Sequence, residues 1–293
     1  MMVRSKILVT GIGGQVGFEL VRSMQGLGDI IALDRSAMEL SDADSVRRVL
    51  REVAPDIIVN PAAYTAVDRA ETEPELAERI NVVAPRVMAE EAQRAGALLI
   101  HYSTDYVFDG VKSQPYQEDD ETNPQNVYGR TKRDGERAIA ATGCAHLIFR
   151  TSWVYGGRGR NFMLTMLKLA SEREQLRVVA DQIGAPTWSG TIAALTASVV
   201  AQGVGRGRDW WRDRSGIYNL TASGSTSWAG FADAIFELAQ LKNRPVVMPI
   251  PSSAYPTPAR RPANSTLSHE KLARVFGLQP PAWRDALRLC LAV

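Results

Sequence analysis

The chain has 293 residues, of which 45% are hydrophobic and 23% are charged, and its formal net charge is +2. This composition is that of an ordinary globular protein, and the small net charge gives no argument for a nucleic-acid or membrane partner. The sequence has no segment typical of a cleaved signal and no apolar run long enough to cross a bilayer, so we expect a cytoplasmic protein.

The first predicted strand leads into a glycine-rich turn. Residues 6–10 form a short apolar run, and a helical pattern follows the turn through about residue 24. Between them, Gly11, Gly14 and Gly17 follow the pattern Gly-x-x-Gly-x-x-Gly. Such a turn lets the backbone approach a pyrophosphate and directs a helix N-terminus toward it. We therefore predict that this turn binds a dinucleotide through Gly11, Gly14, Gln15, Val16 and Gly17.

The second predicted strand, residues 30–33, ends in two residues that bear on the choice of cofactor. Asp34 lies about 20 residues after the turn, where an acidic side chain can bond a ribose hydroxyl of NAD(H). Arg35 beside it can instead accept the 2′-phosphate of NADP(H). The two residues favour opposite cofactors, so the pattern leaves the preference open. Glu39, four residues after Arg35, is a further candidate cofactor-binding residue.

Strand-like and helical segments alternate through the first half of the chain. Further strands are predicted at residues 55–59, 98–102 and 146–149, and helices at residues 41–52, 74–95 and from about 128. This alternation is typical of an α/β fold with a Rossmann-like, doubly wound parallel sheet, which binds ligands beyond the carboxyl ends of its strands. The residues after the third strand, Ala62, Ala63 and Tyr64, are accordingly expected to border a cofactor.

The second half of the chain is less regular. Short strands are predicted at residues 178–180 and 217–220, and helices at residues 161–172, 189–201, 227–240, 269–276 and 281–291. Five prolines between residues 249 and 262 indicate an extended, ordered loop. Residues 206–214 mix arginines with tryptophans, which we interpret as a surface loop rather than a nucleic-acid contact. We expect residues 1–153 to form a NAD(P)-binding domain to which later segments return, and residues 154–293 to form mainly a smaller substrate-binding domain.

Tyr128 and Lys132 lie four residues apart at the start of a helical pattern, a spacing that places both side chains on one face of a helix. The phenol of an unperturbed tyrosine has a pKa of about 10, and an ammonium group beside it favours the phenolate and lowers that pKa. The pair can therefore exchange a proton with a substrate oxygen. Tyr-x-x-x-Lys alone is a weak signal, because a tyrosine and a lysine often share a helix face by chance.

Several segments together resemble the extended short-chain dehydrogenase/reductase superfamily and, within it, the dTDP-4-dehydrorhamnose reductases. The matching segments keep the family's order and lie at residues 11–17, 60–68, 103–108, 126–132, 150–155, 181–187 and 255–267. The resemblance implies a catalytic group of Thr104, Tyr128 and Lys132, in which Tyr128 donates the proton. It also implies NAD(P)H-dependent reduction of the C4 keto group of dTDP-4-dehydro-L-rhamnose to give dTDP-L-rhamnose, with NADPH as the expected cofactor and NADH possible.

The same resemblance implies a set of substrate-binding residues. Thr65, Val67, Tyr106 and Trp153 match positions near the sugar, and each of them also fits a packing role. Arg261 matches an arginine suited to the nucleotide diphosphate, for which a bidentate cation is physically reasonable. Thr104 and Tyr128 complete this set because both are expected to bond the substrate carbonyl oxygen.

Two alternative functions remain open. An epimerase or dehydratase of the same superfamily would keep its NAD tightly bound, and dehydratases carry an acidic residue near the position of Asp105. The regulatory β subunit of methionine adenosyltransferase also resembles these reductases but acts as a binding partner. The intact Thr104, Tyr128 and Lys132 favour an enzyme.

We expect no metal site, because Cys144 and Cys290 are too few for a cluster and the three histidines show no ligand spacing. Some family members form dimers through glutamates that bind a metal; Glu19 matches one of these, but residues 189–194 lack the second acid. We therefore expect a monomer or a homodimer with a nucleotide sugar as substrate and with no nucleic-acid or membrane partner.

Overall fold

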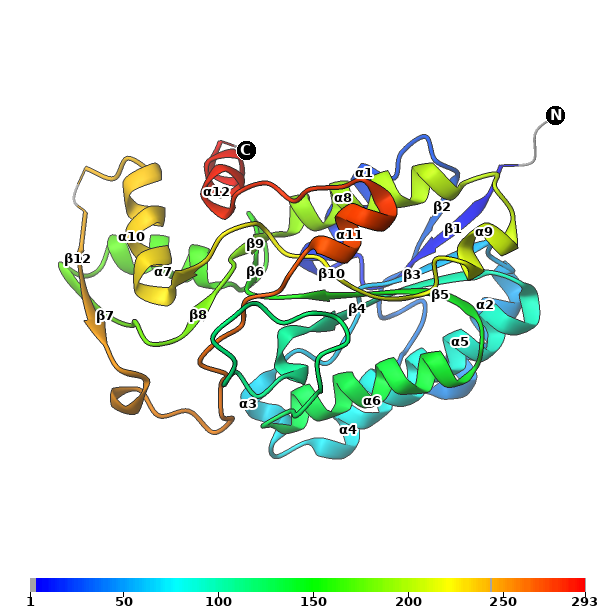
Figure 1. Ribbon diagram of the computed structural model, residues 1–293, viewed down its shortest axis with the longest axis horizontal. Helices are drawn as coiled ribbons and strands as arrows, with labels where there is room; N and C mark the ends of the chain where they lie inside the picture. Colours follow the sequence, from blue (N-terminus) through cyan, green and yellow to red (C-terminus); the bar gives the residue numbers. More distant parts are fainter. Residues whose placement is uncertain (1–3, 243, 293) are drawn as a thin grey trace.

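The computed structural model describes residues 4–242 and 244–292. Outside the described part lie residue 243 and the ends of the two expected domains, residues 1–3 and residue 293. Within that part, six parallel strands form a central sheet in the order β10-β5-β4-β3-β1-β2 (Figure 1). The strands are β1 (Lys6–Val9), β2 (Asp29–Ala32), β3 (Ile57–Asn60), β4 (Leu98–Thr104), β5 (Ala145–Thr151) and β10 (Gly216–Asn219). The strand order reverses between β1 and β3, and open α/β sheets bind ligands at such a point.

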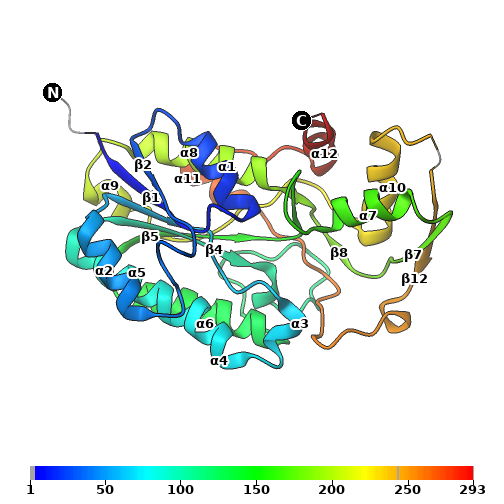
Figure 2. The same cartoon turned by 180° about the vertical axis from the view of Figure 1, so that it is seen from behind.

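Alternate residues of each strand face opposite helical layers (Figures 1 and 2). On one face, Ile7 and Val9 belong to an apolar cluster with residues of α1 (Gln15–Ser23), α8 (Ser189–Gly203), α9 (Arg208–Arg212) and α11 (Glu270–Phe276). On the other face, Leu8 belongs to a cluster with residues of α2 (Ala43–Val53), α5 (Ala84–Ala95) and α6 (Val127–Ala141). Because both faces are covered, the strands are continuous apolar runs rather than alternating ones.

Short helical segments lie near the carboxyl ends of β3 and β4. They are α3 (Val67–Ala70), α4 (Pro74–Glu78), the π-helical turn η1 (Arg79–Val83) and the 3-10 turn η2 (Asp105–Val107). The helix predicted over residues 74–95 is therefore present but is interrupted by η1. A Cβ at Gly135 of α6 would lie 2.1 Å from the Asn81 carbonyl oxygen, so glycine is needed where α6 crosses this turn.

A smaller body lies beyond the sheet, on the side to which the strand arrows point (Figure 2). Its helices are α7 (Phe162–Ala170), α10 (Trp228–Leu238) and α12 (Trp283–Leu291), which pack around an apolar cluster that includes Tyr155, Phe231 and Leu287. Short strands pair beside them: β6 (Val154–Tyr155) with β9 (Thr187–Trp188), β7 (Gln175–Val179) with β12 (Val246–Ile250), and β8 (Ile183–Gly184) with β11 (Thr226–Ser227). The 3-10 turn η3 (Ser252–Ala254) follows β12.

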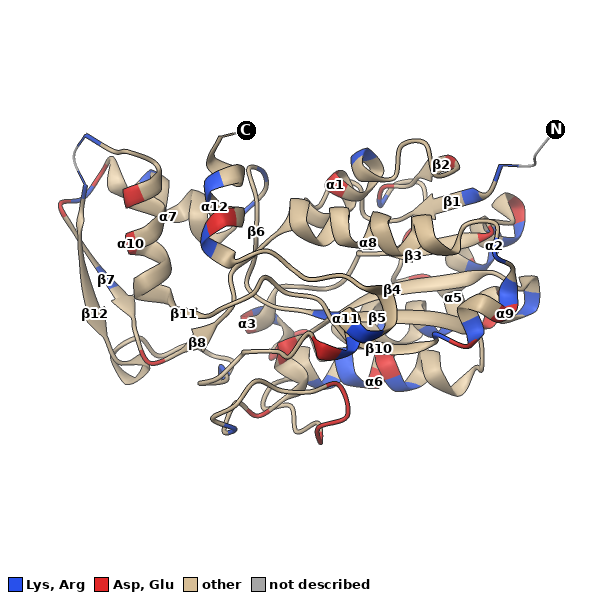
Figure 3. Cartoon of the chain, turned by 45° about the horizontal axis from the view of Figure 1, so that its top comes forward, with Lys and Arg blue, Asp and Glu red and all other residues tan. Residues whose placement is uncertain are grey.

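Charged side chains of both signs are interspersed over the molecule, as the nearly balanced composition predicts (Figure 3). Among the helices of residues 4–242 and 244–292, none has the length and apolar content needed to cross a membrane.

The predicted α/β fold with a doubly wound parallel sheet is confirmed. The strand predicted at residues 217–220 extends this sheet as β10, beside β5. Residues 208–212 form the short helix α9 rather than a loop, although the expected packing is present, with the Arg214 guanidinium 4.1 Å from the Trp210 ring centroid. Part of the proline-rich segment is a strand, which tolerates Pro249 because β12 pairs along one edge, with β7, among the residues that the structure describes.

Candidate active site

The glycine-rich turn joins β1 to α1. Gly11 has a left-handed backbone (φ 59°), and its carbonyl oxygen accepts a hydrogen bond from the Gly14 N–H at 2.9 Å. A Cβ at Gly17 would lie 2.3 Å from that same oxygen, so only glycine allows the helix to approach the turn this closely. Helix α1 begins at Gly14 without a side-chain cap, which leaves its first backbone N–H groups available to an anion. The turn therefore fits the pyrophosphate of a dinucleotide.

The two other predicted residues of the turn point away from it. The Gln15 side-chain oxygen accepts a hydrogen bond from Asn161 Nδ2 at 2.8 Å and so connects α1 to the start of α7. Val16 packs against the apolar cluster between the sheet and α8. Both residues thus hold the start of α1 in place through their side chains, while their backbone N–H groups belong to the uncapped helix N-terminus.

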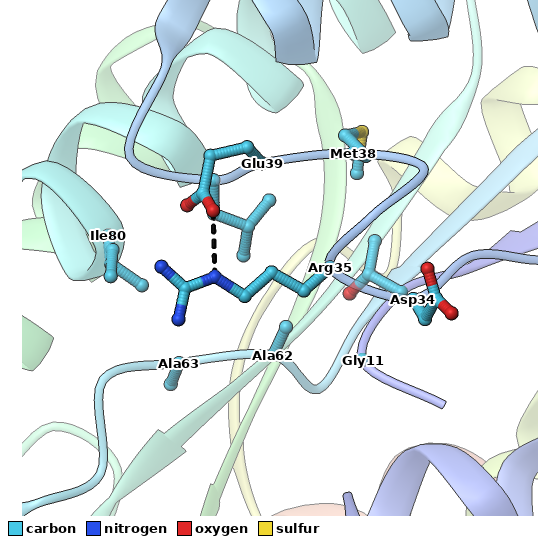
Figure 4. A pocket seen from close by; sticks show the side chains of 10 residues that line it. Gly11, Asp34, Arg35, Met38, Glu39, Ala62, Ala63 and Ile80 are labelled. Atoms are coloured by element: carbon cyan, nitrogen blue, oxygen red, sulfur yellow. Dashed lines mark hydrogen bonds and ion pairs between the residues drawn. The ribbon is translucent and has the colours of Figure 1, made fainter. Parts of the chain in front are cut away.

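A cavity of about 150 Å³ lies beside the turn and is shown in Figure 4. It brings together Gly11, Asp34, Arg35, Glu39, Ala62 and Ala63, which the sequence predicted, with Thr10, Met38, Leu40 and Ile80, which it did not. Arg35 extends over Ala62 and Ala63 toward Ile80, and its Nε donates to Glu39 Oε2 at 2.7 Å (Figure 4). A cation that lies beside two carboxylates, next to a glycine-rich turn, fits the ribose end of a dinucleotide.

The two carboxylates of this cavity are held by local hydrogen bonds. Asp34 Oδ1 accepts from the Ser36 hydroxyl at 2.6 Å and from the backbone N–H groups of Ser36 and Ala37 at 2.9 and 3.1 Å. These bonds, the Ser36 hydroxyl first, lower the pKa of Asp34. The pKa of Glu39 is lowered to about 2 by the Ser41 backbone N–H and then by Arg35. Both groups are therefore anions at neutral pH.

Tyr64 is fixed at the entrance to α3 by its backbone. Its N–H donates to Asn81 Oδ1 at 2.9 Å, and its carbonyl oxygen accepts from Asn81 Nδ2 at 3.1 Å. Its hydroxyl donates to Glu73, and its ring packs in a small apolar cluster with Val127 and Tyr128. Tyr64 thus borders the proposed catalytic tyrosine as well as the segment that carries Ala62 and Ala63.

Thr104 ends β4, and Tyr128 and Lys132 lie on the first turns of α6 beside it. Helix α6 is capped by Asn126, whose Oδ1 accepts from the Gly129 N–H at 2.7 Å. A Cβ at Gly129 would lie 2.1 Å from the Tyr106 carbonyl oxygen, so glycine allows α6 to contact the turn that follows Thr104. This contact brings the Thr104 hydroxyl beside the Tyr128 phenol, where their hydrogen bond lowers the pKa of Tyr128.

The net pKa shift of Tyr128 is upward, to about 12, because burial of the phenol outweighs the bond from Thr104. This is opposite to the lowering that the sequence predicted from Lys132. The physical reason is the direction of the lysine side chain: Lys132 Nζ donates to the Tyr102 carbonyl oxygen at 2.6 Å and lies 3.0 Å from His101 Nε2. Burial also lowers the pKa of Lys132, to about 8, although the nearby Glu136 acts to raise it.

Asp105 is a buried carboxyl directly beside this group. Its Oδ1 accepts from the Thr104 hydroxyl at 3.1 Å, while Oδ2 is buried without a hydrogen-bond partner among the described residues. Burial raises the pKa of Asp105 to about 6, against the nearby Ser265 and Thr104 hydroxyls, which act to lower it. The site therefore contains an acid that titrates close to neutral pH.

The predicted substrate-binding residues surround the same end of the sheet. The Tyr106 ring lies 5.7 Å from the Tyr128 ring in an edge-on arrangement. Trp153 has a left-handed backbone (φ 47°) and stacks on Trp228 with ring centroids 3.5 Å apart. Thr65 is exposed and Val67 begins α3.

Arg261 reaches this side of the site from the proline-rich loop. It donates to Asp68 through Nη1 at 3.1 Å and Nη2 at 3.0 Å. Because Asp68 lies on α3, this two-point pair connects the loop to the segment that carries Thr65 and Val67. Arg261 thus lies beside the segment of Thr65 and Val67 and near Tyr106, whereas Trp153 packs on Trp228 at the start of α10.

Sequence comparisons agree with this geometry. The family profile described as the RmlD substrate binding domain matches residues 5–293. The dTDP-4-dehydrorhamnose reductase of Burkholderia thailandensis is 50% identical over 98% of both chains, and that of Escherichia coli K12 is 45% identical over 97% of this chain and 96% of its own. The crystal structure of the Bacillus anthracis dTDP-4-dehydrorhamnose reductase in complex with NADP has a TM-score of 0.91, with 34% identity over 99% of both chains.

The parallel sheet, the glycine-rich turn and these similarities define an oxidoreductase of the extended short-chain dehydrogenase/reductase class. Within that class, the chain belongs to the dTDP-4-dehydrorhamnose reductase family. The resemblance inferred from the sequence motifs is thereby confirmed.

Proposed function

We propose that the chain reduces the C4 keto group of dTDP-4-dehydro-L-rhamnose to give dTDP-L-rhamnose, with NADPH as hydride donor and NADH as a possible substitute. The observation that carries this proposal is the position of Thr104 at the carboxyl end of β4 beside Tyr128 of α6, with Lys132 on the same helix bonded to β4, in a chain of this family. Two relatives bear the name of this activity, and the Bacillus anthracis protein binds NADP.

Tyr128 is the proposed proton donor. With a pKa of about 12 its phenol is protonated at neutral pH, which is the form that a reductase requires before the reaction. A bound reduced nicotinamide supplies the hydride to the carbonyl carbon. Thr104 lies beside the phenol and bonds the same carbonyl oxygen, which orients it toward Tyr128. Lys132 is bonded to the Tyr102 carbonyl oxygen rather than to the phenol, so its positive charge acts through space, from one helical turn along α6, on the phenolate that remains when the proton has left.

The cofactor is proposed to lie across the switch point of the sheet. The turn from Gly11 to Gly17 holds the pyrophosphate, and the ribose end enters the cavity that contains Arg35. The guanidinium is bonded to Glu39 through Nε alone among the described residues, which leaves its two terminal nitrogens for a 2′-phosphate. This arrangement favours NADPH.

The nucleotide sugar is proposed to bind between the sheet and the smaller body, so that residues 154–293 contribute contacts, with Arg261 among them, opposite those from the first part of the chain. Tyr106 and Trp153 border the sugar, together with Thr65 and Val67 from the segment around α3. Arg261 binds the diphosphate while Asp68 holds its guanidinium in place. We place this activity in the cytoplasm, in a monomer or a homodimer.

One observation favours a second candidate, a dehydratase of the same superfamily. Asp105 is a buried acid next to Thr104, and its pKa of about 6 suits proton transfer near neutral pH. Such an enzyme recycles its cofactor and keeps it bound, whereas a reductase consumes it. The absorbance and mass spectra of the purified protein distinguish the two, because a dehydratase would be isolated with nicotinamide cofactor.

The direct test follows the absorbance of reduced nicotinamide. The protein is mixed with dTDP-4-dehydro-6-deoxyglucose, a 3,5-epimerase, and either NADPH or NADH. We expect one equivalent of NADPH to be consumed per sugar, and much less consumption with Tyr128→Phe or Thr104→Val. Full turnover by Tyr128→Phe would remove Tyr128 as proton donor. A folded protein that binds NADPH but consumes neither cofactor would refute the proposed reaction.

A further inference from the structure

A chain of buried polar side chains connects Lys132 to the glycine-rich turn. The Thr10 hydroxyl donates to Asn60 Oδ1 at 2.7 Å, Asn60 Nδ2 lies 3.1 Å from His101 Nδ1, and His101 Nε2 lies 3.0 Å from Lys132 Nζ. All four side chains are at most 2% exposed. Asn60 and His101 are direct neighbours in the register of β3 and β4, and Thr10 directly follows β1 on the other side of β3. The reaction described above uses only the lysine at the end of this chain.

The donors and acceptors of this chain depend on the charge of Lys132. Burial, and the positive charge of Lys132 whenever it is protonated, hold the pKa of His101 well below its usual range, so the ring is neutral, with one nitrogen donating and the other accepting. In the observed arrangement Asn60 presents its NH2 group to His101 Nδ1. The ring proton then lies on Nε2 and is donated to Lys132, which must be an uncharged amine to accept it.

An ammonium group at Lys132 requires the opposite arrangement. The ammonium can only donate, so His101 Nε2 must accept and the ring proton must lie on Nδ1. Asn60 then has to present its carbonyl oxygen, which a half-turn of the carboxamide achieves without moving any other atom. Its NH2 group then donates to the Thr10 hydroxyl oxygen. Both arrangements give Asn60, His101 and Lys132 complementary donors and acceptors along the chain, and both leave Lys132 bonded to the Tyr102 carbonyl oxygen.

We infer that Asn60 and His101 are positioning residues that hold Lys132 in one place in both of its charge states, by exchanging the His101 tautomer and the Asn60 amide orientation. The inference rests on the proposed function, in which the Lys132 charge stabilises the Tyr128 phenolate. A lysine that lost its only buried side-chain partner on deprotonation would instead leave the site. With this pair, Lys132 can release and regain a proton without rearranging.

The surroundings of Lys132 allow its titration to be observed on its own. Four elements place titratable or charged groups around it: His101 and Tyr102 from β4, Asp105 from η2, Tyr128 and Glu136 from α6, and Arg150 from β5, which is paired with Glu136. Burial raises the pKa of Tyr102 and that of Tyr128, the latter to about 12, whereas Asp105 has a pKa of about 6. Lys132, with a pKa of about 8, therefore titrates between them.

The first test reads the His101 tautomer directly. The chain has three histidines, so 15N-histidine labelling and two-bond 1H–15N correlation spectra give three ring signals, which His101→Gln assigns. His146 is a built-in reference, because its Nδ1 lies 2.9 Å from the Cys144 carbonyl oxygen and must carry the proton. We expect His101 to stay neutral and to change from the Nδ1–H to the Nε2–H form as the pH rises through about 8. Lys132→Met should abolish that change.

A single His101 tautomer from pH 6 to pH 10, or a doubly protonated ring, would overturn the inference. This outcome is separate from the failure of the proposed reaction. An active wild-type enzyme with a fixed tautomer refutes only the positioning role, and a tautomer change in a protein that consumes no NADPH refutes only the reaction.

The second test uses two amides that each replace one ring nitrogen. His101→Gln places its amide near the former Nε2 and keeps an acceptor for Lys132, whereas His101→Asn places it near the former Nδ1 and keeps only the contact with Asn60. In His101→Asn the buried Lys132 ammonium loses an acceptor, so we expect the alkaline limb of the pH profile of kcat to move to lower pH by about one unit. At pH values above that limb, kcat should then be about tenfold lower than in the wild type. With His101→Gln the limb should stay within about 0.3 units of the wild type. Equal shifts in both variants would indicate packing alone and would contradict the inference.

Discussion

Arg150 of β5 and Glu136 of α6 form a two-point ion pair that is almost completely buried. Arg150 Nε donates to Glu136 Oε1 at 2.9 Å, and Nη2 donates to Oε2 at 2.7 Å. The two side chains are 2% and 3% exposed. Glu136 lies one helical turn after Lys132, so this pair fixes the catalytic helix to the strand beside β4. The guanidinium is also bonded to the Glu118 carbonyl oxygen and lies 4.9 Å from the Phe108 ring centroid.

Removing one partner of this pair should destabilise the whole fold. Glu136→Gln leaves the guanidinium charge buried without a counter-ion, and we expect a loss of about 3–5 kcal/mol in the free energy of unfolding. Urea denaturation at neutral pH measures the loss. The double variant Arg150→Met with Glu136→Leu removes both charges and should regain most of the stability. If the double variant is no more stable than Glu136→Gln, the loss comes from packing rather than from an unpaired charge.

The glycine at position 17 is expected to be essential for binding the cofactor. In Gly17→Ala the new Cβ would meet the Gly11 carbonyl oxygen at 2.3 Å and its carbon at 2.7 Å, so the turn must move. We expect a loss of about 1–3 kcal/mol in the free energy of unfolding. The Kd for NADPH, measured by titration calorimetry, should rise at least about tenfold, because the pyrophosphate site is displaced. Gly157→Ala is the matched control, since nothing lies within 4 Å of its Cβ. Equal effects of the two substitutions would contradict the steric argument.

The parts of the site that the sequence predicted are those in which a short segment carries its own geometry. The strand, turn and helix from residue 6 to residue 23 give the glycine spacing, and the four-residue separation of Tyr128 and Lys132 places both on α6. The order of alternating strands and helices was enough to predict the parallel sheet. Each of these features depends on neighbours within about 20 residues.

The contacts that the sequence did not predict join segments that are far apart in the chain. His101 falls within the strand predicted at residues 98–102 and lies in β4, but its bond to Lys132 depends on how α6 packs against β4. Asn60 meets His101 only through the register of β3 and β4. Met38, Leu40 and Ile80 carry no motif, and they line the cofactor cavity because η1 and the loop after β2 converge there. The one sequence feature that pointed to these contacts was the presence of polar residues within the otherwise apolar run of residues 98–104.

Replacing Arg35 should shift the cofactor preference toward NADH. The guanidinium is the cation of the cavity in Figure 4, and Glu39 is the anion that accompanies it. In Arg35→Ala the Glu39 carboxylate remains and repels a 2′-phosphate, so we expect kcat/KM for NADPH to fall on the order of 10- to 100-fold. The value for NADH, which has a hydroxyl at this position, should change little. Absorbance assays with both cofactors measure the ratio.

Glu39→Gln is the companion of that variant. Its amide keeps the shape of the side chain but removes the anion, so the kcat/KM for NADPH should rise or stay constant while that for NADH does not improve. A parallel fall for both cofactors in Arg35→Ala would instead assign Arg35 to the shared part of the dinucleotide.

One part of the pH dependence of the protein's stability should come from Asp105. Its pKa is raised by burial to about 6 in the folded chain, whereas an aspartate in the unfolded chain has a pKa of about 3.9. Between these values the folded state binds a proton that the unfolded state has lost. The derivative of the unfolding free energy with pH is then negative, so this residue lowers stability as the pH rises from about 4 to about 6. Two pKa units correspond to about 2–3 kcal/mol at most.

Asp105→Asn removes this titration while keeping the size of the side chain. Relative to the wild type, the variant should therefore gain up to about 2–3 kcal/mol between pH 4 and pH 6 and change no further above that range. Carboxylates with lowered pKa values, such as Glu39, titrate in both proteins and cancel in the difference. Urea midpoints measured at half-unit steps of pH give this difference directly. If the difference in unfolding free energy between the variant and the wild type were instead constant across the whole pH range, the Asp105 carboxyl would be ionised in the folded protein at pH 4.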